Sequence, residues 1–239
     1  MAATLLGRGL PHVVAEALAV AVAGVVGLLV GLVAIGRPGT SPLASLIITL
    51  GLGIGSYAVI ILGWGDQPVS FDGLQGVVDV GGVTMQRQYV LVVLVTAATF
   101  AALALFFNRT YLGRVLTACS SNPRAARLVG IDVARMGLVA FALGGALGGL
   151  AGVLLTPLQP VSFDSDVGIA INGFAAAVFG GVLRPGTALV GALVLGVVEA
   201  LVAGYWKASL ESGVALVLML AIMVWQGSRR SLVADESAA

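Results

Sequence analysis

The sequence is poor in charged residues and in the residue types that most enzymes use for chemistry. Only 10% of its 239 residues are charged, whereas 59% are hydrophobic, which leaves no room for a separate soluble domain. It has one cysteine, Cys119, and one histidine, His12. The single cysteine excludes an internal disulfide, and the single histidine excludes a multi-histidine metal site, so we predict no metal centre.

Catalytic motifs are missing as well. The one lysine, Lys207, follows Trp206 and belongs to no G-x-x-x-x-G-K-[ST] phosphate loop, so we expect the chain itself to bind no nucleotide or other cofactor. No set of nucleophile, base and acid is present. The net charge of +1 provides no overall field that would attract nucleic acid. The sequence therefore predicts neither an enzyme nor a nucleic-acid-binding protein.

Long apolar segments are what the sequence has in abundance. They are continuous rather than alternating, which is typical of transmembrane helices and not of a barrel. We predict an all-α, polytopic transmembrane bundle of about six or seven spans, forming one domain over residues 1–239. The expected spans are 13–36, 43–63, 89–108, 136–156, 169–183, 187–204 and 212–226. The short segment 169–183 is expected to be broken, re-entrant or strongly buried.

The distribution of arginine predicts the orientation of these spans, because basic residues favour the cytoplasmic side. With segment 109–135 inside, the inner loops hold nine arginines, namely Arg37, Arg109, Arg114, Arg124, Arg127, Arg135, Arg184, Arg229 and Arg230. The outer loops then hold Arg87 and Lys207. We expect a cytoplasmic C-terminus. Seven spans then place the N-terminus outside, so either the first segment is not a full span or upstream sequence is missing, and we favour missing sequence.

Two patterns recur along the chain. The hexapeptide Gln-Pro-Val-Ser-Phe-Asp occurs at 67–72 and again at 159–164, both times after a span expected to run outward. It indicates either two similar turns or an internal repeat that forms paired lips of an external docking surface. Glycines also recur every four residues, a spacing that lets helices pack closely in lipid. They are Gly27 and Gly31, Gly51 and Gly55, Gly145 and Gly149, and Gly144, Gly148 and Gly152.

Few polar residues fall inside the spans. Glu199 is the main exception, and a carboxylate within a span is costly enough that a functional role is the default hypothesis. The alternative is a carboxylate at a helix end near the outer interface. Asn172 and Thr49 could line a pathway, or each could hydrogen-bond to a neighbouring helix.

Segment 109–135 is a basic, mostly polar island that is too long for a simple turn. Asn122 followed by Pro123 predicts an N-cap with proline at the first helical position. Arg124 and Arg127, three residues apart, would share one face. Gly130 suits the left-handed position at the helix C-terminus. The sequence therefore predicts a short capped helix within a loop, with Asp132 capping the helix that follows.

Residues 114–135 of the island contain an Arg-Ala…Ala-x-Leu-x-Gly-Ile pattern, and further matching stretches are 46–54, 141–152, 173–182, 185–186 and 195–199. On these residues the chain resembles the permease subunits of ABC importers for branched-chain amino acids and their relatives for amides and urea. The resemblance covers roughly residues 40 to 230. It departs at the N-terminus, where an Asn-Phe-Ala-His-Gly turn is absent, and this agrees with a shortened N-terminus.

The resemblance implies a transporter subunit in a bacterial plasma membrane. It implies a coupling helix that docks on a cytoplasmic ATPase, which would hydrolyse ATP in place of this chain. The residues that match this helix are Asn122, Pro123, Arg124, Ala126, Arg127, Leu128 and Gly130. A second permease and an extracytoplasmic substrate-binding protein would complete the assembly. Two alternatives stay open: a secondary transporter or channel that works alone, and a truncated, inactive permease paralogue.

Overall fold

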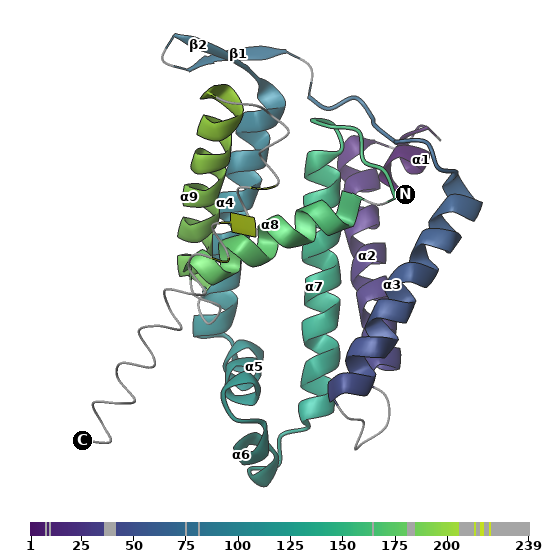
Figure 1. Cartoon of the computed structure of the whole chain (residues 1–239). Helices are drawn as coiled ribbons and strands as arrows, with labels where there is room; N and C mark the ends of the chain where they lie inside the picture. The colour runs from purple at the N-terminus through teal and green to yellow at the C-terminus, as the bar shows by residue number, and fades with distance from the viewer. Residues whose placement is uncertain are drawn as a thin grey trace. The chain divides into compact units, whose positions relative to one another are not determined.

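The computed structural model describes residues 1–7, 9, 11–35, 42–74, 76–80, 82–163, 165–180 and 185–205, with single positions at 213, 216, 217 and 220. It divides into two compact units, Met1–Phe163 and Asp164–Ala239. The first unit contains α1 (Ala2–Leu6), α2 (His12–Ile35), α3 (Pro42–Trp64), β1 (Val77–Val80), β2 (Val83–Gln86), α4 (Arg87–Arg109), α5 (Tyr111–Ser121), α6 (Pro123–Leu128) and α7 (Val133–Leu155). The second unit contains α8 (Ser165–Gly180) and α9 (Pro185–Tyr205), as labelled in Figure 1.

Five of the described helices are long and apolar enough to cross a bilayer, which confirms the predicted all-α polytopic class. These stretches are His12–Ile35, Ile47–Trp64, Arg87–Arg109, Val133–Leu155 and Gly186–Tyr205. The predicted segment 169–183 falls on α8, whose 16 residues make it the shorter apolar helix that the sequence indicated. The predicted span 212–226 lies outside the described residues except at 213, 216, 217 and 220.

Helices α2 and α7 form the tightest contact of the first unit. They pack antiparallel, with Gly27 of α2 against Gly145 of α7. A Cβ added at Gly27 would lie 2.5 Å from the carbonyl oxygen of Phe141 and 2.9 Å from Cα of Gly145. Such a close approach of two backbones is the way that helices associate in lipid, where lipid tails are as apolar as the side chains. The glycine spacing therefore predicted a real helix contact.

The rows of glycines spaced four residues apart, which we call glycine ridges, differ in what they contact. Gly145 and Gly149 face α2, whereas a Cβ at Gly144, Gly148 or Gly152 would meet nothing within 4 Å. The Gly51 and Gly55 ridge of α3 is equally open in the described structure. Of the spacings found in the sequence, two are thus used for packing inside the first unit.

The second unit is built around the contact between α8 and α9. Ala175 and Ala176 of α8 and Leu195 of α9 form a buried cluster, against which Ala192 also packs. A Cβ at Gly191 would lie 2.6 Å from the backbone nitrogen of Gly180. Small residues on both helices therefore allow this pair, too, to pack backbone against backbone.

A two-stranded antiparallel hairpin precedes α4, within a region that the sequence analysis treated as an outer loop. Val77 pairs with Gln86 and Val80 with Val83, so two residues connect the strands. The connecting residues are Gly81 and Gly82, and a Gly-Gly pair between two short runs rich in β-branched residues is a known hairpin signal. Gly82 has a φ of +88°, which the turn requires and which glycine adopts without strain. The hairpin was missed although its signal was present.

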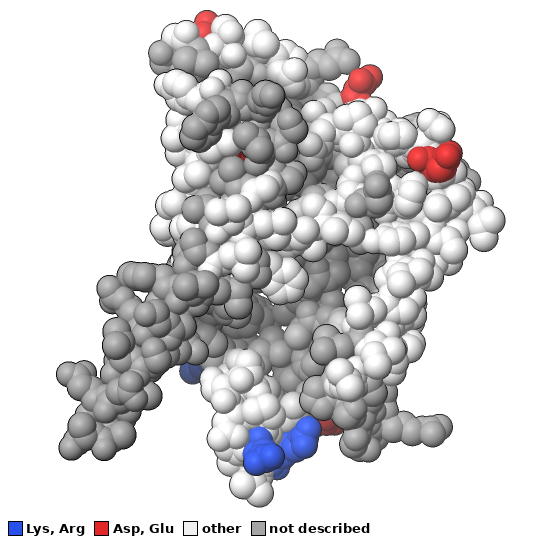
Figure 2. Space-filling model, viewed as in Figure 1, with Lys and Arg blue, Asp and Glu red and all other residues white. Residues whose placement is uncertain are grey.

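Charges are separated along the first unit. The hairpin and the loops at residues 65–74 and 156–163 lie at one end, which we call the hairpin end, and α5 and α6 lie at the other, the α6 end. Exposed Asp66, Asp72 and Asp79 belong to the hairpin end. The α6 end carries the exposed arginines Arg109, Arg114, Arg124, Arg127 and Arg135. Figure 2 shows basic side chains gathered at the α6 end, with one acidic side chain beside them, and the other visible acidic side chains toward the opposite end of this unit.

Candidate functional site

The basic island folds into two short helices that follow α4 after a tight turn at Thr110. The Thr110 hydroxyl accepts a hydrogen bond from the backbone N–H of Gly113 at 3.0 Å, which caps α5. It also donates to the carbonyl of Phe106 at 2.6 Å, in the last turn of α4. Gly113 is buried in this turn. A Cβ at this position would lie 2.6 Å from Cα of Phe107, so only glycine fits without a shift of the backbone. The turn from α4 into α5 is therefore held from both sides.

Helix α6 begins as the sequence predicted. The side-chain oxygen of Asn122 accepts a hydrogen bond from the backbone N–H of Ala125 at 3.0 Å, and Pro123 occupies the first turn. Asn122 has extended backbone angles, as an N-cap requires. Pro123 loses nothing at this position, because the first N–H groups of a helix have no partner within the helix.

The C-terminal end of α6 is closed by a Schellman motif centred on Gly130. The N–H of Ile131 donates to the carbonyl of Ala126 at 3.0 Å, and the N–H of Gly130 donates to the carbonyl of Arg127 at 3.1 Å. Gly130 has a φ of +82° and open space around its Cα, so the backbone conformation, not crowding, selects glycine. The predicted left-handed position is confirmed.

A small apolar cluster supports α6 from behind. Val115 and Cys119 of α5, four residues apart, and Ala126 of α6 are buried together. Ile131, Val133 and Met136 pack against them. Cys119 thus serves as a small buried side chain. Because Ala126 is the only described residue of α6 that is buried, the rest of this helix is left at the surface.

The surface of α6 combines positive charge with large apolar side chains. Arg124 and Arg127 are exposed, and neither forms an ion pair with a residue that the structure describes. Leu128 is 88% exposed and Val129 is 76% exposed. These two large apolar side chains therefore face outward, although water is an unfavourable environment for them. Arginine is enriched in protein–protein contact surfaces, and exposed apolar side chains that lie together often mark such surfaces.

The N-terminus of α7 is also capped. A side-chain oxygen of Asp132 accepts hydrogen bonds from the N–H groups of Ala134 and Arg135, both at 3.1 Å. The other oxygen forms an ion pair with Nε of Arg135 at 3.0 Å, so this arginine, unlike Arg124 and Arg127, has a partner within the unit. The negative side chain at the start of α7 also suits the positive end of the helix dipole.

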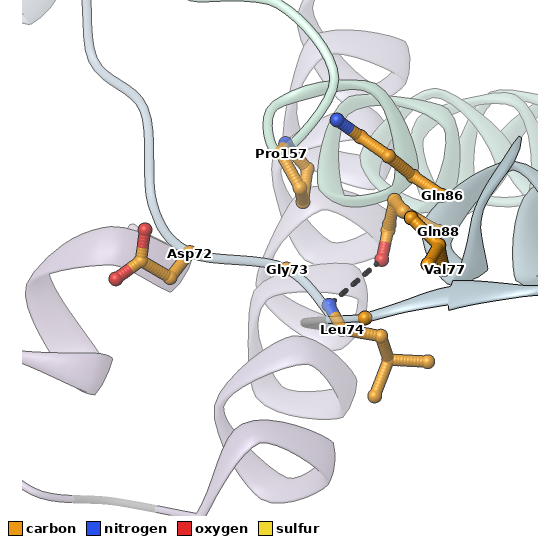
Figure 3. A pocket seen from close by; sticks show the side chains of 8 residues that line it. Asp72, Gly73, Leu74, Val77, Gln86, Gln88 and Pro157 are labelled. Carbon is orange, nitrogen blue, oxygen red and sulfur yellow. Dashed lines mark hydrogen bonds between the residues drawn. The ribbon is translucent and has the colours of Figure 1, made fainter.

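At the hairpin end, Gln88 organises a shallow cavity of about 410 Å³ that Figure 3 shows from close by. Gln88 is buried, and its Oε1 accepts a hydrogen bond from the N–H of Leu74 at 3.2 Å while its Nε2 donates to the carbonyl of Leu154 at 3.4 Å. The lining residues are Asp72, Gly73, Leu74, Gly76, Val77, Gln86, Gln88 and Pro157. Gln88 is not among the site residues predicted from the sequence, because one glutamine near a span carries no pattern.

The three predicted pathway residues lie in different units. Thr49 is half-buried on α3 of the first unit. In the second unit, Glu199 is buried on α9 one turn after Leu195, and Asn172 is half-buried on α8 one turn before Ala176. Because residues four apart share a helix face, both polar groups lie on the faces that form the α8–α9 contact. Their role in a pathway stays a prediction.

Taken together, five span-sized helices and an exposed, capped helix at one end describe a polytopic membrane protein. A family model described as "Branched-chain amino acid transport system / permease component" matches residues 1–223. The chain therefore belongs to this permease family, which confirms the resemblance drawn from the sequence. No solved structure matches it significantly.

The curated relatives agree with this family. The LivH permease protein of the high-affinity branched-chain amino acid transport system of Salmonella typhimurium is 32% identical over 133 residues, which are 55% of this chain and 43% of that protein. The BraD permease of Pseudomonas aeruginosa is 31% identical over 147 residues, 61% of this chain and 48% of the relative. The AraH permease of the L-arabinose transport system of Escherichia coli is 33% identical over 114 residues, 44% of this chain and 34% of the relative. The matched stretch thus spans less than half the length of each of these relatives.

Proposed function

We propose that the chain is the pathway-forming permease subunit of an ABC importer, and that α6 is the coupling helix that docks on a cytoplasmic ATPase. The observation that carries this proposal is the surface of α6, where Arg124 and Arg127 stand beside exposed Leu128 and Val129. Such a surface is costly to leave in water and gains by binding a partner. The partner, and not this chain, would bind and hydrolyse ATP.

The construction of the island suits the transmission of movement. Helix α6 has both ends capped, rests on a buried cluster and is followed after four residues by α7. On its other side, α5 is joined to α4 through Thr110. Since these connections are short and hydrogen-bonded, a displacement of α6 by the ATPase would be passed to the spans α4 and α7 and would not be absorbed by a flexible loop.

The arginine distribution also bears on how the chain is oriented across the membrane. The α6 end of the first unit holds most of its arginines, and because basic residues favour the cytoplasmic side, this supports a cytoplasmic position for α6. We infer a multi-pass protein of the bacterial plasma membrane with a cytoplasmic C-terminus. A second permease subunit and an extracytoplasmic substrate-binding protein would complete the importer.

We propose the substrate class from the transport systems to which the relatives belong. Two of the relatives named above belong to branched-chain amino acid systems and the third belongs to an L-arabinose system. We therefore propose branched-chain amino acids or related small polar solutes, including amides and urea, as the cargo. Glu199, Asn172 and Thr49 are proposed to face the pathway.

Co-purification tests the coupling role. The tagged chain is expressed with the proteins encoded beside its gene, extracted in mild detergent and examined for a bound ATPase. The double variant Arg124→Glu/Arg127→Glu is compared with Arg109→Glu/Arg114→Glu, which makes the same change of charge at exposed sites outside α6.

The expected result is that the ATPase is retained by the wild type and by the Arg109/Arg114 control but is lost from the α6 variant. A weakening of about tenfold or more is expected, since reversal of charges within a contact costs several kcal/mol. Equal retention by both double variants would contradict the role assigned to α6. A well-folded wild type that never retains an ATPase would favour a transporter or channel that works alone.

A further inference from the structure

The two identical hexapeptides of this chain pair with each other. Val69 and Val161, the third residues of the two copies, form an antiparallel bridge at the hairpin end of the first unit. The N–H of Val69 donates to the carbonyl of Val161 at 2.9 Å, and the N–H of Val161 donates to the carbonyl of Val69 at 3.0 Å. We call residues 67–72 and 159–163 the hexapeptide clasp. The last residue of the second copy, Asp164, lies outside the described residues.

The sequence of each copy suits a pairing that is confined to one residue pair. In an antiparallel ladder, alternate residues turn their N–H groups toward the partner and away from it. Because Val69 and Val161 turn inward, Pro68 and Pro160 occupy positions whose N–H groups would point outward. Because proline has no N–H, its presence removes no hydrogen bond from the bridge. It also leaves the outer edge without a donor, so a further strand cannot pair there. The same residue, proline, thus protects the same position in both copies.

The clasp joins a loosely packed span to a tightly packed one. Helix α3, which leads into the first copy, has none of its membrane-spanning window buried. It contacts α2, and no comparable contact with α7 is found among the described residues. Helix α7, which leads into the second copy, is packed against α2 through Gly145 and Gly149. The ring of Phe163 meets the ring of Tyr57 on α3, edge to face, with centroids 6.1 Å apart.

The loop that carries the first copy is attached at a second point, just after residue 72. Gln88 holds Leu74 and Leu154 at once, and Gly73 is so close to Pro157 that a Cβ would lie 2.7 Å from the proline Cβ (Figure 3). The Gln88 side chain that makes this attachment is 7% exposed, whereas Val69 at the clasp is 37% exposed. The hydrogen bonds of Gln88 fix the loop to the ends of α4 and α7. The exposed bridge is therefore the point at which α3 can be released while the rest of the loop stays in place.

We propose that the hexapeptide clasp is a releasable latch that holds the hairpin end of α3 against the α2–α7 pair. When the bridge is made, α3 is fastened to α7 through the two loops. When it opens, α3 can move at this end while Gln88 keeps α4 and α7 together. The link between this opening and transport rests on the proposed function, but the latch itself does not.

Spin labels test the latch in the isolated chain. Labels are placed on cysteines at Leu62 of α3 and Gly148 of α7, both exposed, in a Cys119→Ala background in lipid. Val161→Pro removes the N–H that donates to Val69, whereas Val161→Ala shortens the side chain and keeps both backbone hydrogen bonds. A shift to longer and broader label distances in Val161→Pro, absent from Val161→Ala, is expected. Unchanged distances in Val161→Pro would overturn the latch.

Cross-linking tests whether the latch must open during transport. The pair Val69→Cys/Val161→Cys is directly opposed, at the Cα separation of an antiparallel hydrogen-bonded pair, which a disulfide can bridge. Ser70→Cys/Val161→Cys is the matched control, because residue 70 points to the other face of the strand. Mild oxidation should close the first pair and not the second, as counted by labelling of the remaining thiols.

In the complex assembled with its genomic neighbours, oxidation of the Val69→Cys/Val161→Cys pair should abolish uptake, and reduction should restore it. The two single-cysteine variants should be insensitive to the oxidant. Full uptake with the bridge closed would overturn the latch as a moving part, as would failure of the pair to cross-link. If the wild-type complex takes up no substrate, the proposed function fails, and the spin-label distances still decide whether the clasp holds α3.

Discussion

The α2–α7 pair and the α5–α6 elbow (residues 111–128) are held together in different ways. The helix pair relies on glycines that bring two backbones into contact at Gly27 and Gly145. The elbow relies on side-chain caps at Thr110 and Asn122 and on a small buried cluster around Cys119. In lipid the backbone groups are already satisfied within each long helix, so close packing is what remains to be gained. A helix of six residues has mostly end groups, so capping decides whether it forms at all.

The largest effect should follow from filling the α2–α7 contact. A Cβ at Gly145 would lie 2.5 Å from the carbonyl oxygen of Ala23, so Gly145→Val must push the helices apart. We expect the free energy of unfolding to fall by roughly 1–3 kcal/mol or more, because overpacked interfaces are strained. The readout is the apparent melting temperature of the purified protein in detergent.

Gly144→Val is the matched control for this change. It lies one residue away in the same helix, where a Cβ meets nothing within 4 Å. If both valine variants melted at the same temperature, the glycine contact would not be what holds this pair together.

The next effect concerns the left-handed residue at the end of α6. Gly130→Val forces a β-branched residue to a φ of +82°, which should cost about 1–3 kcal/mol and unwind the end of α6. Gly130→Asn should be milder, because asparagine tolerates this conformation. Limited proteolysis of the loop would report the unwinding, and equal protection of both variants would show that the C-terminal cap is not needed.

A smaller loss is expected at the other end of α6. Asn122→Ala removes the oxygen that accepts from the N–H of Ala125, for about 1 kcal/mol of local stability. Asn122→Asp keeps an acceptor and should stay close to the wild type. Hydrogen exchange of the Ala125 amide measures this directly. Equal exchange in the two variants would mean that the asparagine does not cap the helix.

The smallest effect on stability should come from the α6 surface. Arg124→Glu/Arg127→Glu changes exposed side chains that form no ion pair within the described structure, so stability should change by less than about 0.5 kcal/mol. The melting temperature should therefore match the wild type while ATPase binding is lost. A marked loss of stability would show that these arginines support the fold and do not serve a partner.

The same comparison separates what the sequence could predict from what it could not. Caps are local: Asn122, Pro123, Gly130 and Asp132 each act on nearby residues, so their spacing alone predicted both ends of α6 and the start of α7. Packing is not local. The sequence offered Gly144 and Gly145 as equivalent ridges, and which of them faces α2 depends on the rotation of α7, which no single segment contains.

The remaining differences have a similar origin. The bridge between Val69 and Val161 joins residues far apart in the chain, so the repeat was visible in the sequence but its pairing was not. The hairpin at Val77–Gln86 carried a local Gly-Gly signal that was overlooked among apolar spans. Gln88 had no sequence signal, because its importance comes from three segments that meet around it.

The most direct measurement is a photo-cross-linking experiment on the assembled complex. A photoreactive amino acid is placed at Leu128 of α6 or, as the control, at Leu62 of α3, since both side chains are 88% exposed. If α6 is the docking helix, we expect a covalent product between the Leu128 position and an ATPase subunit, and none from the Leu62 position. A product with the ATPase from Leu62 but not from Leu128 would contradict the assignment of α6 as the docking helix.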